Sequence, residues 1–416
     1  MNSRGAPRHR SSHAKPGLCS PVFVSQNQGV GNISVEESAS RMQKFGLVLS
    51  GGGARGAYQA GVLKALVEIA SSLGIRQPFP VISGVSAGAI NAAHLAAHAH
   101  DLDVGVEKLA QLWTNLTTER VFRTDAISAG KSGFRFLADA TIGAFYKKKL
   151  ARSFLDTAPL HRLLNEEIPF DQIAQNINNS HLRALAITAM NYSNANSVSF
   201  VQGHSDCPMW IRERRASERT LVTSDHVMGS SAIPLFFPPI KVGNDHFGDG
   251  CLRNAAPLSP AIHLGADRLI VISVRRPDSA VGAQTAHIDP SLARILGVIL
   301  NALLLDATDI DMERMSRINN TIENVPENQR RNLELRKVDF LWIRPSQDIG
   351  HLAADLFDRL PAVIRYLVGN LGSSREASEL TSYLLFDPDF CGELVRLGYQ
   401  DGLNQQAEVV RFLTAR

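Results

Sequence analysis

The chain has 416 residues, of which 44% are hydrophobic and 20% charged, enough apolar material for one large α/β domain or for two domains. Its net charge of +3 is mild and its basic residues are scattered, so a nucleic-acid-binding protein is not indicated. Four cysteines lie far apart without CxxC spacing, which argues against a disulfide scaffold or a cysteine zinc site and fits a reducing compartment.

Residues 1–43 are rich in Ser, Asn, Gln, Gly, Arg and His and show no periodicity, so they are predicted to be a disordered leader. An export or targeting signal read by a receptor is the alternative interpretation of this segment. Residues 1–20 contain no apolar stretch of signal-peptide length, and no run of about 18 apolar residues predicts a membrane span. We therefore expect a cytoplasmic protein, or one that associates peripherally with a membrane.

A glycine-rich turn follows the first expected strand. The apolar run Phe45–Ser50 predicts a buried strand and Ala57 to about Leu73 an amphipathic helix, with Gly51-Gly52-Gly53-Ala54-Arg55-Gly56 between them. The backbone N–H groups of such a turn, reinforced by the helix dipole, bind negative charge. The turn fits either a pyrophosphate cradle of the GxGxxG type or an oxyanion hole beside a nucleophile. We favour the oxyanion hole, because Glu68, which would have to contact a ribose, falls inside the helix.

A serine-containing turn begins the next βα unit. The apolar run Phe79–Ile82 predicts a strand, and Gly84-Val85-Ser86-Ala87-Gly88 leads from it into a small-residue helix over residues 87–100. A serine at such a turn is held in a tight backbone geometry that lifts its hydroxyl clear of the sheet. The flanking glycines remove Cβ atoms that would clash where strand and helix meet. The stretch therefore predicts a nucleophile elbow, at the same carboxyl edge of a parallel sheet as the glycine turn.

Two features between residues 94 and 167 allow more than one interpretation. His94 and His98 have the i, i+4 spacing of metal ligands, but no HExxH pattern or third ligand accompanies them, so packing or surface positions are expected. Residues 101–167 predict a mostly helical insertion, in which Phe134–Leu137 and Phe145–Lys149 mix aromatic and cationic side chains. This insertion fits either a cap that faces anionic lipid headgroups or an ordinary amphipathic helix.

Alternating strands and helices are expected from residue 182, and mostly helices beyond residue 290. The C-terminal third carries no chemical motif, so we expect it to serve as scaffold or oligomer surface. The predicted elements are strands over 182–190, 197–202, 268–274 and 338–343, and helices over 224–232, 257–265 and 292–324, with further helices from 352 to the C-terminus.

A serine hydroxyl is a poor nucleophile until a base takes its proton. His263, His287 and His351 are available for a triad, but none lies in a loop with the character of a site. Asp249 lies between two glycines, which allow its loop to approach another loop closely. A carboxylate can act as the base if desolvation raises its pKa and the hydroxyl lies within hydrogen-bond reach. The alternative is an aspartate that only forms a β-turn.

The glycine turn, the serine elbow and Asp249-Gly250, in this order, resemble the motifs of the patatin-like phospholipase family. The likeness runs from about Phe45 to Val274 and includes Ser231-Ala232-Ile233-Pro234 and the Phe237-Pro238-Pro239 that follows it. It implies a three-layer α/β/α fold with a mostly parallel central sheet. The catalytic domain would cover residues 44–275, followed by a mainly helical C-terminal region over 276–416.

The same resemblance implies a Ser–Asp dyad in which Ser86 is the nucleophile and Asp249 the base. Backbone N–H groups of the Gly51–Gly56 loop would form the oxyanion hole, and Arg55 would orient this loop or meet substrate phosphate. Where the family has Asp-Gly-Gly or Asp-Gly-Ala, this chain has Asp249-Gly250-Cys251. We expect the small cysteine to preserve the shape of the loop, the alternatives being a slightly altered dyad geometry or a reactive thiol.

The expected function is that of a serine lipid acyl hydrolase, of phospholipase A or lysophospholipase type. It would cleave fatty-acyl esters through an acyl-enzyme, without a metal or cofactor, on a lipid taken from a membrane or micelle surface. A nucleotide-binding module that uses the glycine turn and a non-catalytic lipid-binding protein are the alternatives. The sequence does not specify the headgroup, the acyl chain, the sn-position or the oligomeric state.

Overall fold

The computed structural model describes residues 45–123, 153, 155–277, 291–330, 333, 335–369 and 372–415. The predicted leader, the aromatic and cationic segments over 134–137 and 145–149, and His287 lie outside the described residues. The limits proposed for the catalytic domain and the C-terminal region stay predictions.

Up to β9 the described elements are a mixture of strands and helices, with a run of helices between β2 and β3, and after β9 they are mostly helical. The strands are β1 (Phe45–Leu49), β2 (Val81–Val85), β3 (Ala184–Asn191), β4 (Ser197–Gly203), β5 (Ile211–Arg212), β6 (Arg215–Arg219), β7 (Ile240–Val242), β8 (Asp245–Asp249), β9 (Arg268–Ile272) and β10 (Asp339–Ile343). The helices are η1 (Gly53–Arg55), α2 (Gly56–Ser72), α3 (Ala87–Ala97), α4 (Leu102–Thr114), α5 (Thr118–Val121), α7 (Ala158–Glu167), α8 (Phe170–Asn178), α9 (Ser224–Ser230), η2 (Gly250–Arg253), α10 (Ser259–His263), α11 (Leu292–Leu304), α12 (Asp306–Glu323), α13 (Glu327–Arg330), α14 (Ile349–Ala354), η3 (Phe357–Arg359), α15 (Ala362–Gly369), α16 (Ser378–Leu384), α17 (Pro388–Asn404) and α18 (Gln406–Thr414).

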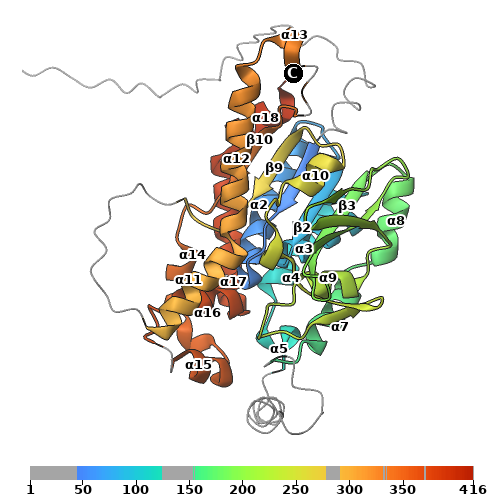
Figure 1. The fold of residues 1–416 in the computed structure, drawn as a ribbon. Coiled ribbons are helices and arrows are strands. Elements are labelled where there is room, and N and C mark those ends of the chain that lie inside the picture. Colours follow the sequence, from blue (N-terminus) through green and yellow to red (C-terminus); the bar gives the residue numbers. More distant parts are fainter. Residues whose placement is uncertain are drawn as a thin grey trace, which may run out of the picture.

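A mixed sheet forms the centre of the fold, with strands in the order β10-β9-β1-β2-β3-β4-β6-β5 (Figure 1). The strands from β10 to β3 run parallel to one another, and β4 is antiparallel to β3. The β7–β8 hairpin pairs with the last residues of β3. The predicted central sheet, mostly parallel, is therefore confirmed.

Helices cover both faces of the sheet. Successive side chains of a strand point to opposite faces, and apolar side chains on both faces have to be buried. On β1, Leu47 and Leu49 pack in one core with side chains of α2 and α3. Val48 belongs to a second core, with Leu258 at the start of α10 and Met312 of α12. The strands β1 and β2 are buried along their whole length, which is why they read as continuous apolar runs. The result is a three-layer α/β/α arrangement.

The prediction of one long helix over 292–324 is wrong, because the structure has two helices there, α11 and α12. The break falls at the buried Leu305, which has φ −117° and ψ −41°. Asp306 and Asp309 lie in the first turn of α12, where the helix dipole favours negative charge, and Arg275 forms ion pairs with both. Both helices bury an apolar side, so the hydrophobic pattern continues across the break and could not reveal it.

The C-terminal helices pack directly on the first βα unit. The helix α17 lies along α2, and the two backbones approach closely at glycines: a Cβ on Gly61 would lie 2.0 Å from the carbonyl oxygen of Val395. A Cβ on Gly398 would lie 2.1 Å from the carbonyl oxygen of Tyr58. In addition, β10 extends the sheet beside β9. None of the helices in the described ranges has both the length and the apolar character needed to cross a membrane.

Candidate active site

Ser86 follows β2 directly and adopts a left-handed backbone conformation, with φ 55° and ψ −127°. Such a conformation is strained for a residue with a side chain and persists only where its surroundings impose it. The surroundings here are tight, since a Cβ on Gly84 would lie 2.2 Å from the carbonyl oxygen of Gly88. A Cβ on Gly88 would lie 2.3 Å from the carbonyl oxygen of Leu49. The predicted elbow geometry is therefore present at Ser86.

Two further serines hold the peptide groups of the elbow. The N–H of Ser86 donates to Ser230 Oγ at 2.9 Å, and Ser230 Oγ donates to the carbonyl oxygen of Thr188 at 2.6 Å. Ser231 Oγ donates to the carbonyl oxygen of Ser86 at 3.0 Å. All these groups are buried, so each bond satisfies a polar group that would otherwise be costly to bury. Sequence reasoning did not identify Ser230, although it is adjacent to the Ser231–Pro234 segment.

Asp249 reaches Ser86 because of the register of the strands on β3. Val85, at the end of β2, pairs with Thr188, and Asp249, at the end of β8, pairs with the next residue, Ala189. The strands β2 and β8 thus follow one another along the same edge of β3. Ser86 Oγ donates a hydrogen bond of 2.7 Å to Asp249 Oδ2, across 163 positions of the sequence. The structure therefore brings together the two residues that the sequence singled out for the dyad.

Burial controls the acidity of the Asp249 carboxyl group. The side chain has 0% exposure, and its burial raises the pKa from the ordinary value of 3.8 to about 6. The hydrogen bonds from Ser86 and from the N–H of Cys251, the latter 2.9 Å long, favour the charged form and limit this rise. The carboxylate is consequently a stronger base than an ordinary aspartate and is still ionised at neutral pH.

The glycine turn lies against the elbow. A Cβ on Gly51 would lie 3.0 Å from Ser86 Cβ and 2.4 Å from Cys251 Sγ, so only glycine fits there. Gly52 and Gly53 have φ of 153° and 59°, which favour glycine as well. The amide of Arg55 donates to Gly52, within the first turn. The amides of Gly53 and Ala54 open this helical turn, where N–H groups have no acceptor within the helix.

The side chain of Arg55 is buried, with 4% exposure, and is held by α16. Its guanidinium forms an ion pair with Glu379, its Nε donates to Ser382 Oγ at 2.8 Å, and it lies 4.5 Å from the centroid of the Tyr383 ring. Of the two predicted roles of Arg55, this geometry favours orienting the loop. Sequence reasoning did not identify the α16 partners, which lie more than three hundred positions away in a region without motifs.

A buried polar network also supports the turn from the side of the elbow helix. Asn91 Nδ2 donates to the carbonyl oxygen of Gly56 at 3.0 Å and to Gln59 Oε1 at 2.9 Å. Trp113 Nε1 donates to Asn91 Oδ1 at 2.7 Å, and Gln59 Nε2 donates to the carbonyl oxygen of Ser50 at 2.8 Å. The network links the glycine turn, α3 and α4, so that their relative positions are determined together.

Cys251 is buried between Gly51 and Asp249, and its pKa is raised well above the ordinary range by burial and by the Asp249 charge. A thiol of this kind is a poor nucleophile, which argues against a reactive Cys251. The small side chain fills the space beside Gly51 and leaves the contact between Asp249 and Ser86 intact.

The histidines considered in the sequence analysis have other partners. His94 Nε2 contacts the carbonyl oxygen of Gly105 at 3.0 Å, and burial lowers its pKa to about 3. The ring of His263 stacks on Trp210, and His351 is exposed beside Asp348. Among the residues that the structure describes, no group of three or more His, Cys, Asp or Glu side chains is arranged to hold a metal ion.

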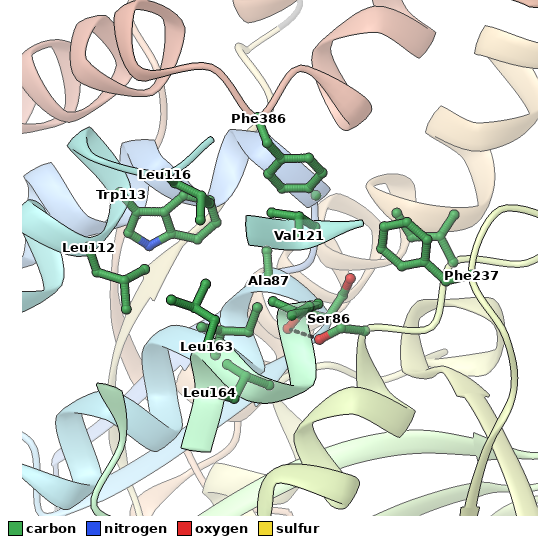
Figure 2. A pocket seen from close by; sticks show the side chains of 15 residues that line it. Ser86, Ala87, Leu112, Trp113, Leu116, Val121, Leu163, Leu164, Phe237 and Phe386 are labelled. Atoms are coloured by element: carbon green, nitrogen blue, oxygen red, sulfur yellow. Dashed lines mark hydrogen bonds between the residues drawn. The ribbon is translucent and has the colours of Figure 1, made fainter. Parts of the chain in front are cut away.

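An apolar pocket opens beside Ser86 (Figure 2). Aromatic rings of Trp113, Phe237 and Phe386 and the side chains of Leu163 and Leu164 surround it, with Ser86 at one end. The full lining consists of Gly53, Ser86, Ala87, Ile90, Leu112, Trp113, Leu116, Val121, Leu160, Leu163, Leu164, Ser231, Ile233, Phe237 and Phe386. Only two of these side chains, both serines, are polar, so the pocket suits an apolar group.

Fold and site together have the features of a serine ester hydrolase built on an α/β sheet. The family model described as patatin-like phospholipase matches residues 47–262, more than half of the chain. The chain belongs to the patatin-like phospholipase family, and this membership supports the activity of a lipid-ester hydrolase. The resemblance stated from the motifs is thereby confirmed.

Solved structures give more distant similarities. VipD from Legionella pneumophila matches with 13% identity over 82% of this chain and 67% of that chain, at a TM-score of 0.29. Human GIVD cytosolic phospholipase A2, in complex with methyl gamma-linolenyl fluorophosphonate, matches with 12% identity over 92% of this chain and 64% of that chain, at 0.37. The type III effector protein ExoU matches with 16% identity over 81% and 76%, at 0.28. No curated protein sequence matches the chain.

Proposed function

We propose that this protein is a serine lipid acyl hydrolase of the phospholipase A or lysophospholipase type, with Ser86 as nucleophile and Asp249 as base. The observation that carries the proposal is the hydrogen bond of 2.7 Å from Ser86 Oγ to Asp249 Oδ2, made by a serine in a left-handed elbow. Geometry of this kind activates a hydroxyl, because the proton acceptor already lies within reach. No histidine is needed as an intermediary in this arrangement.

The first half of the reaction forms an acyl-enzyme. Ser86 Oγ attacks the carbonyl carbon of a fatty-acyl ester while its proton passes to Asp249 Oδ2. The carbonyl oxygen, on which negative charge develops, accepts hydrogen bonds from amides of the glycine turn. Gly53, which lines the pocket together with Ser86, and Ala54, which follows it at the start of η1, are the candidates. The intermediate then expels the alcohol, which takes the proton from Asp249, and the acyl group stays on Ser86.

The second half returns the enzyme to its starting state. A water molecule gives one proton to Asp249 and attacks the acyl carbonyl, and the same amides stabilise the oxyanion. Cleavage of the bond to Ser86 Oγ releases the fatty acid, and the proton on Asp249 returns to the serine. The raised pKa of Asp249 suits both directions of this proton transfer at neutral pH.

The apolar pocket accounts for the choice of a fatty-acyl ester. Its wall of leucine and aromatic side chains removes an acyl chain from water, which stabilises binding by roughly 0.8 kcal/mol for each buried CH₂ group. The same apolar wall offers no charged side chain to bind the phosphates of a nucleotide. Glu68, which the nucleotide interpretation requires, instead accepts a hydrogen bond of 2.7 Å from Tyr399 on the outer side of α2.

The test is fluorophosphonate labelling of the purified protein together with a lipid panel and identification of the products. Ser86→Ala is expected to abolish labelling and turnover, and Asp249→Asn to abolish turnover, whereas His263→Ala should behave like the parent. An active Ser86→Ala enzyme would end the proposal. Full turnover in Asp249→Asn would retain the hydrolase but remove the dyad. Tight binding of NAD or ATP without ester hydrolysis would support the nucleotide-binding alternative.

A further inference from the structure

The helix α11 exposes a continuous apolar stripe to solvent. Val298 and Ile299 are 56% and 46% exposed, and the sequence spacing along the stripe is that of one helix face. The remaining exposed members are Leu292, Ile295 and Leu303. A contiguous apolar surface of this kind on a folded protein marks a site of interaction rather than ordinary surface.

The opposite face of α11 is fixed to the catalytic machinery. Tyr383 on α16 donates a hydrogen bond of 2.6 Å from its hydroxyl to Asn301 Oδ1. Gly297 allows α11 to approach Glu379, since a Cβ there would lie 3.1 Å from Glu379 Cβ. The helix also contacts η2, the turn that follows Asp249. Figure 1 shows α11 and α16 close together, so the exposed stripe belongs to the same part of the molecule as the glycine turn.

Cationic side chains border the stripe. A polar cavity beside α11 is lined by four arginines, Arg55, Arg275, Arg276 and Arg294, against two carboxylates. Arg276 and Arg294 are exposed, and neither forms a close ion pair with a carboxylate among the residues that the structure describes, although Arg294 interacts electrostatically with Glu379 across the cavity. An excess of positive charge next to an apolar helix face is complementary to a surface that is apolar inside and anionic at its rim.

We infer that α11 is an interfacial helix that docks the protein on a lipid bilayer containing anionic headgroups. The apolar stripe enters the boundary between headgroups and acyl chains, and Arg276 and Arg294 contact lipid phosphates. This inference rests on the proposed function, because a lipid acyl hydrolase must meet its substrate at such a surface. Docking through α11 would bring the bilayer next to the glycine turn and Asp249, through the contacts with α16 and η2.

The apolar contribution is tested by sedimentation with vesicles, using the full chain with Ser86→Ala so that the vesicles stay intact. Val298→Glu/Ile299→Glu is expected to lower binding to phosphatidylcholine–phosphatidylglycerol vesicles at least about tenfold. Ile211→Glu is the matched control, because Ile211 is 82% exposed on β5, the strand at the far end of the sheet order from β10. Its binding should equal that of the parent. Equal binding of the double variant would overturn the inference.

The charge contribution has its own comparison. Arg276→Gln/Arg294→Gln should lose at least about fivefold in binding to vesicles with phosphatidylglycerol and little in binding to phosphatidylcholine alone, whereas Arg212→Gln on β5 should change neither. Hydrogen–deuterium exchange of the unaltered α11 provides a measurement that needs no α11 variant. Vesicles should slow exchange over Leu292–Leu304, and unchanged exchange there in bound protein would overturn the inference.

Other outcomes separate the alternatives. A dimer of the parent that becomes monomeric in Val298→Glu/Ile299→Glu, with vesicle binding unchanged, would assign the stripe to a second copy of the chain and overturn lipid docking. Vesicle binding that depends on α11 in a protein without any ester hydrolysis would support docking while the proposed function fails. Ester hydrolysis combined with vesicle binding that does not depend on α11 would support the proposed function and overturn the docking inference.

Discussion

Replacement of Glu379 by Gln tests whether the C-terminal region positions the catalytic loop. Glu379 lies on α16, is 23% exposed, and forms the ion pair with the buried guanidinium of Arg55. The amide of glutamine keeps the shape of the side chain but removes the negative charge. Arg55 would then carry its charge in a buried site with only Ser382 and the Tyr383 ring as close partners.

The expected loss can be estimated from this environment. Breaking a fully buried ion pair from one side costs about 3–5 kcal/mol. Here Glu379 is partly exposed, and the Ser382 hydrogen bond and the Tyr383 ring remain, so we expect the free energy of unfolding to fall by about 2 kcal/mol. A small displacement of the turn should also lower kcat about tenfold, equivalent to ~1.4 kcal/mol of transition-state stabilisation.

Urea denaturation and steady-state kinetics on a monomeric ester measure the two effects separately. Glu313→Gln is the matched control, since Glu313 forms an exposed ion pair with Arg317 on α12 and should cost no more than about 0.5 kcal/mol. Arg55→Met/Glu379→Leu removes both charges and should regain part of the stability without regaining kcat. A Glu379→Gln protein with the stability and kcat of the parent would refute the positioning role.

Four further predictions concern the groups around Ser86. Burial raises the pKa of Asp249 to about 6, so kcat should fall as the pH drops below about 6 in a pH–rate profile. The contribution of this carboxyl group to stability is present below its ordinary pKa of 3.8 and is lost as the pH rises through about 6, so at pH 7 the folded protein holds a buried charge. Asp249→Asn removes this charge and should raise the free energy of unfolding at pH 7 by ~1–3 kcal/mol in urea denaturation, while it removes activity. Gly51→Ala should reduce kcat at least about 100-fold, because its Cβ would lie 2.4 Å from Cys251 Sγ, and Cys251→Gly in the same protein should restore part of it; no recovery would contradict this steric explanation. Ser230→Ala should cost ~1–2 kcal/mol of stability by leaving the N–H of Ser86 without its acceptor, and an unchanged thermal midpoint would contradict it.

The site could be predicted where its chemistry is contiguous in the chain. Gly84, Ser86 and Gly88 express a local requirement, since a turn from strand to helix needs a left-handed residue and room for two close backbones. The glycines of the 51–56 turn meet a second local requirement, because their φ values and the neighbouring atoms exclude side chains. These requirements concern the backbone conformation of one residue and the space around its neighbours in sequence, so the local residue pattern is enough to predict them.

The elbow, the glycine turn, the buried parallel strands and the family to which the chain belongs could thus be predicted from local patterns of residues. The contact between Asp249 and Ser86 required the folded chain, since it depends on β2 and β8 pairing with successive residues of β3. Packing likewise decided that Glu379 holds Arg55 and that the helix pattern over 292–324 breaks at Leu305. Strand register and helix packing arise from the combined burial of distant segments, and no local pattern of residues specifies which distant side chain will fill a given place.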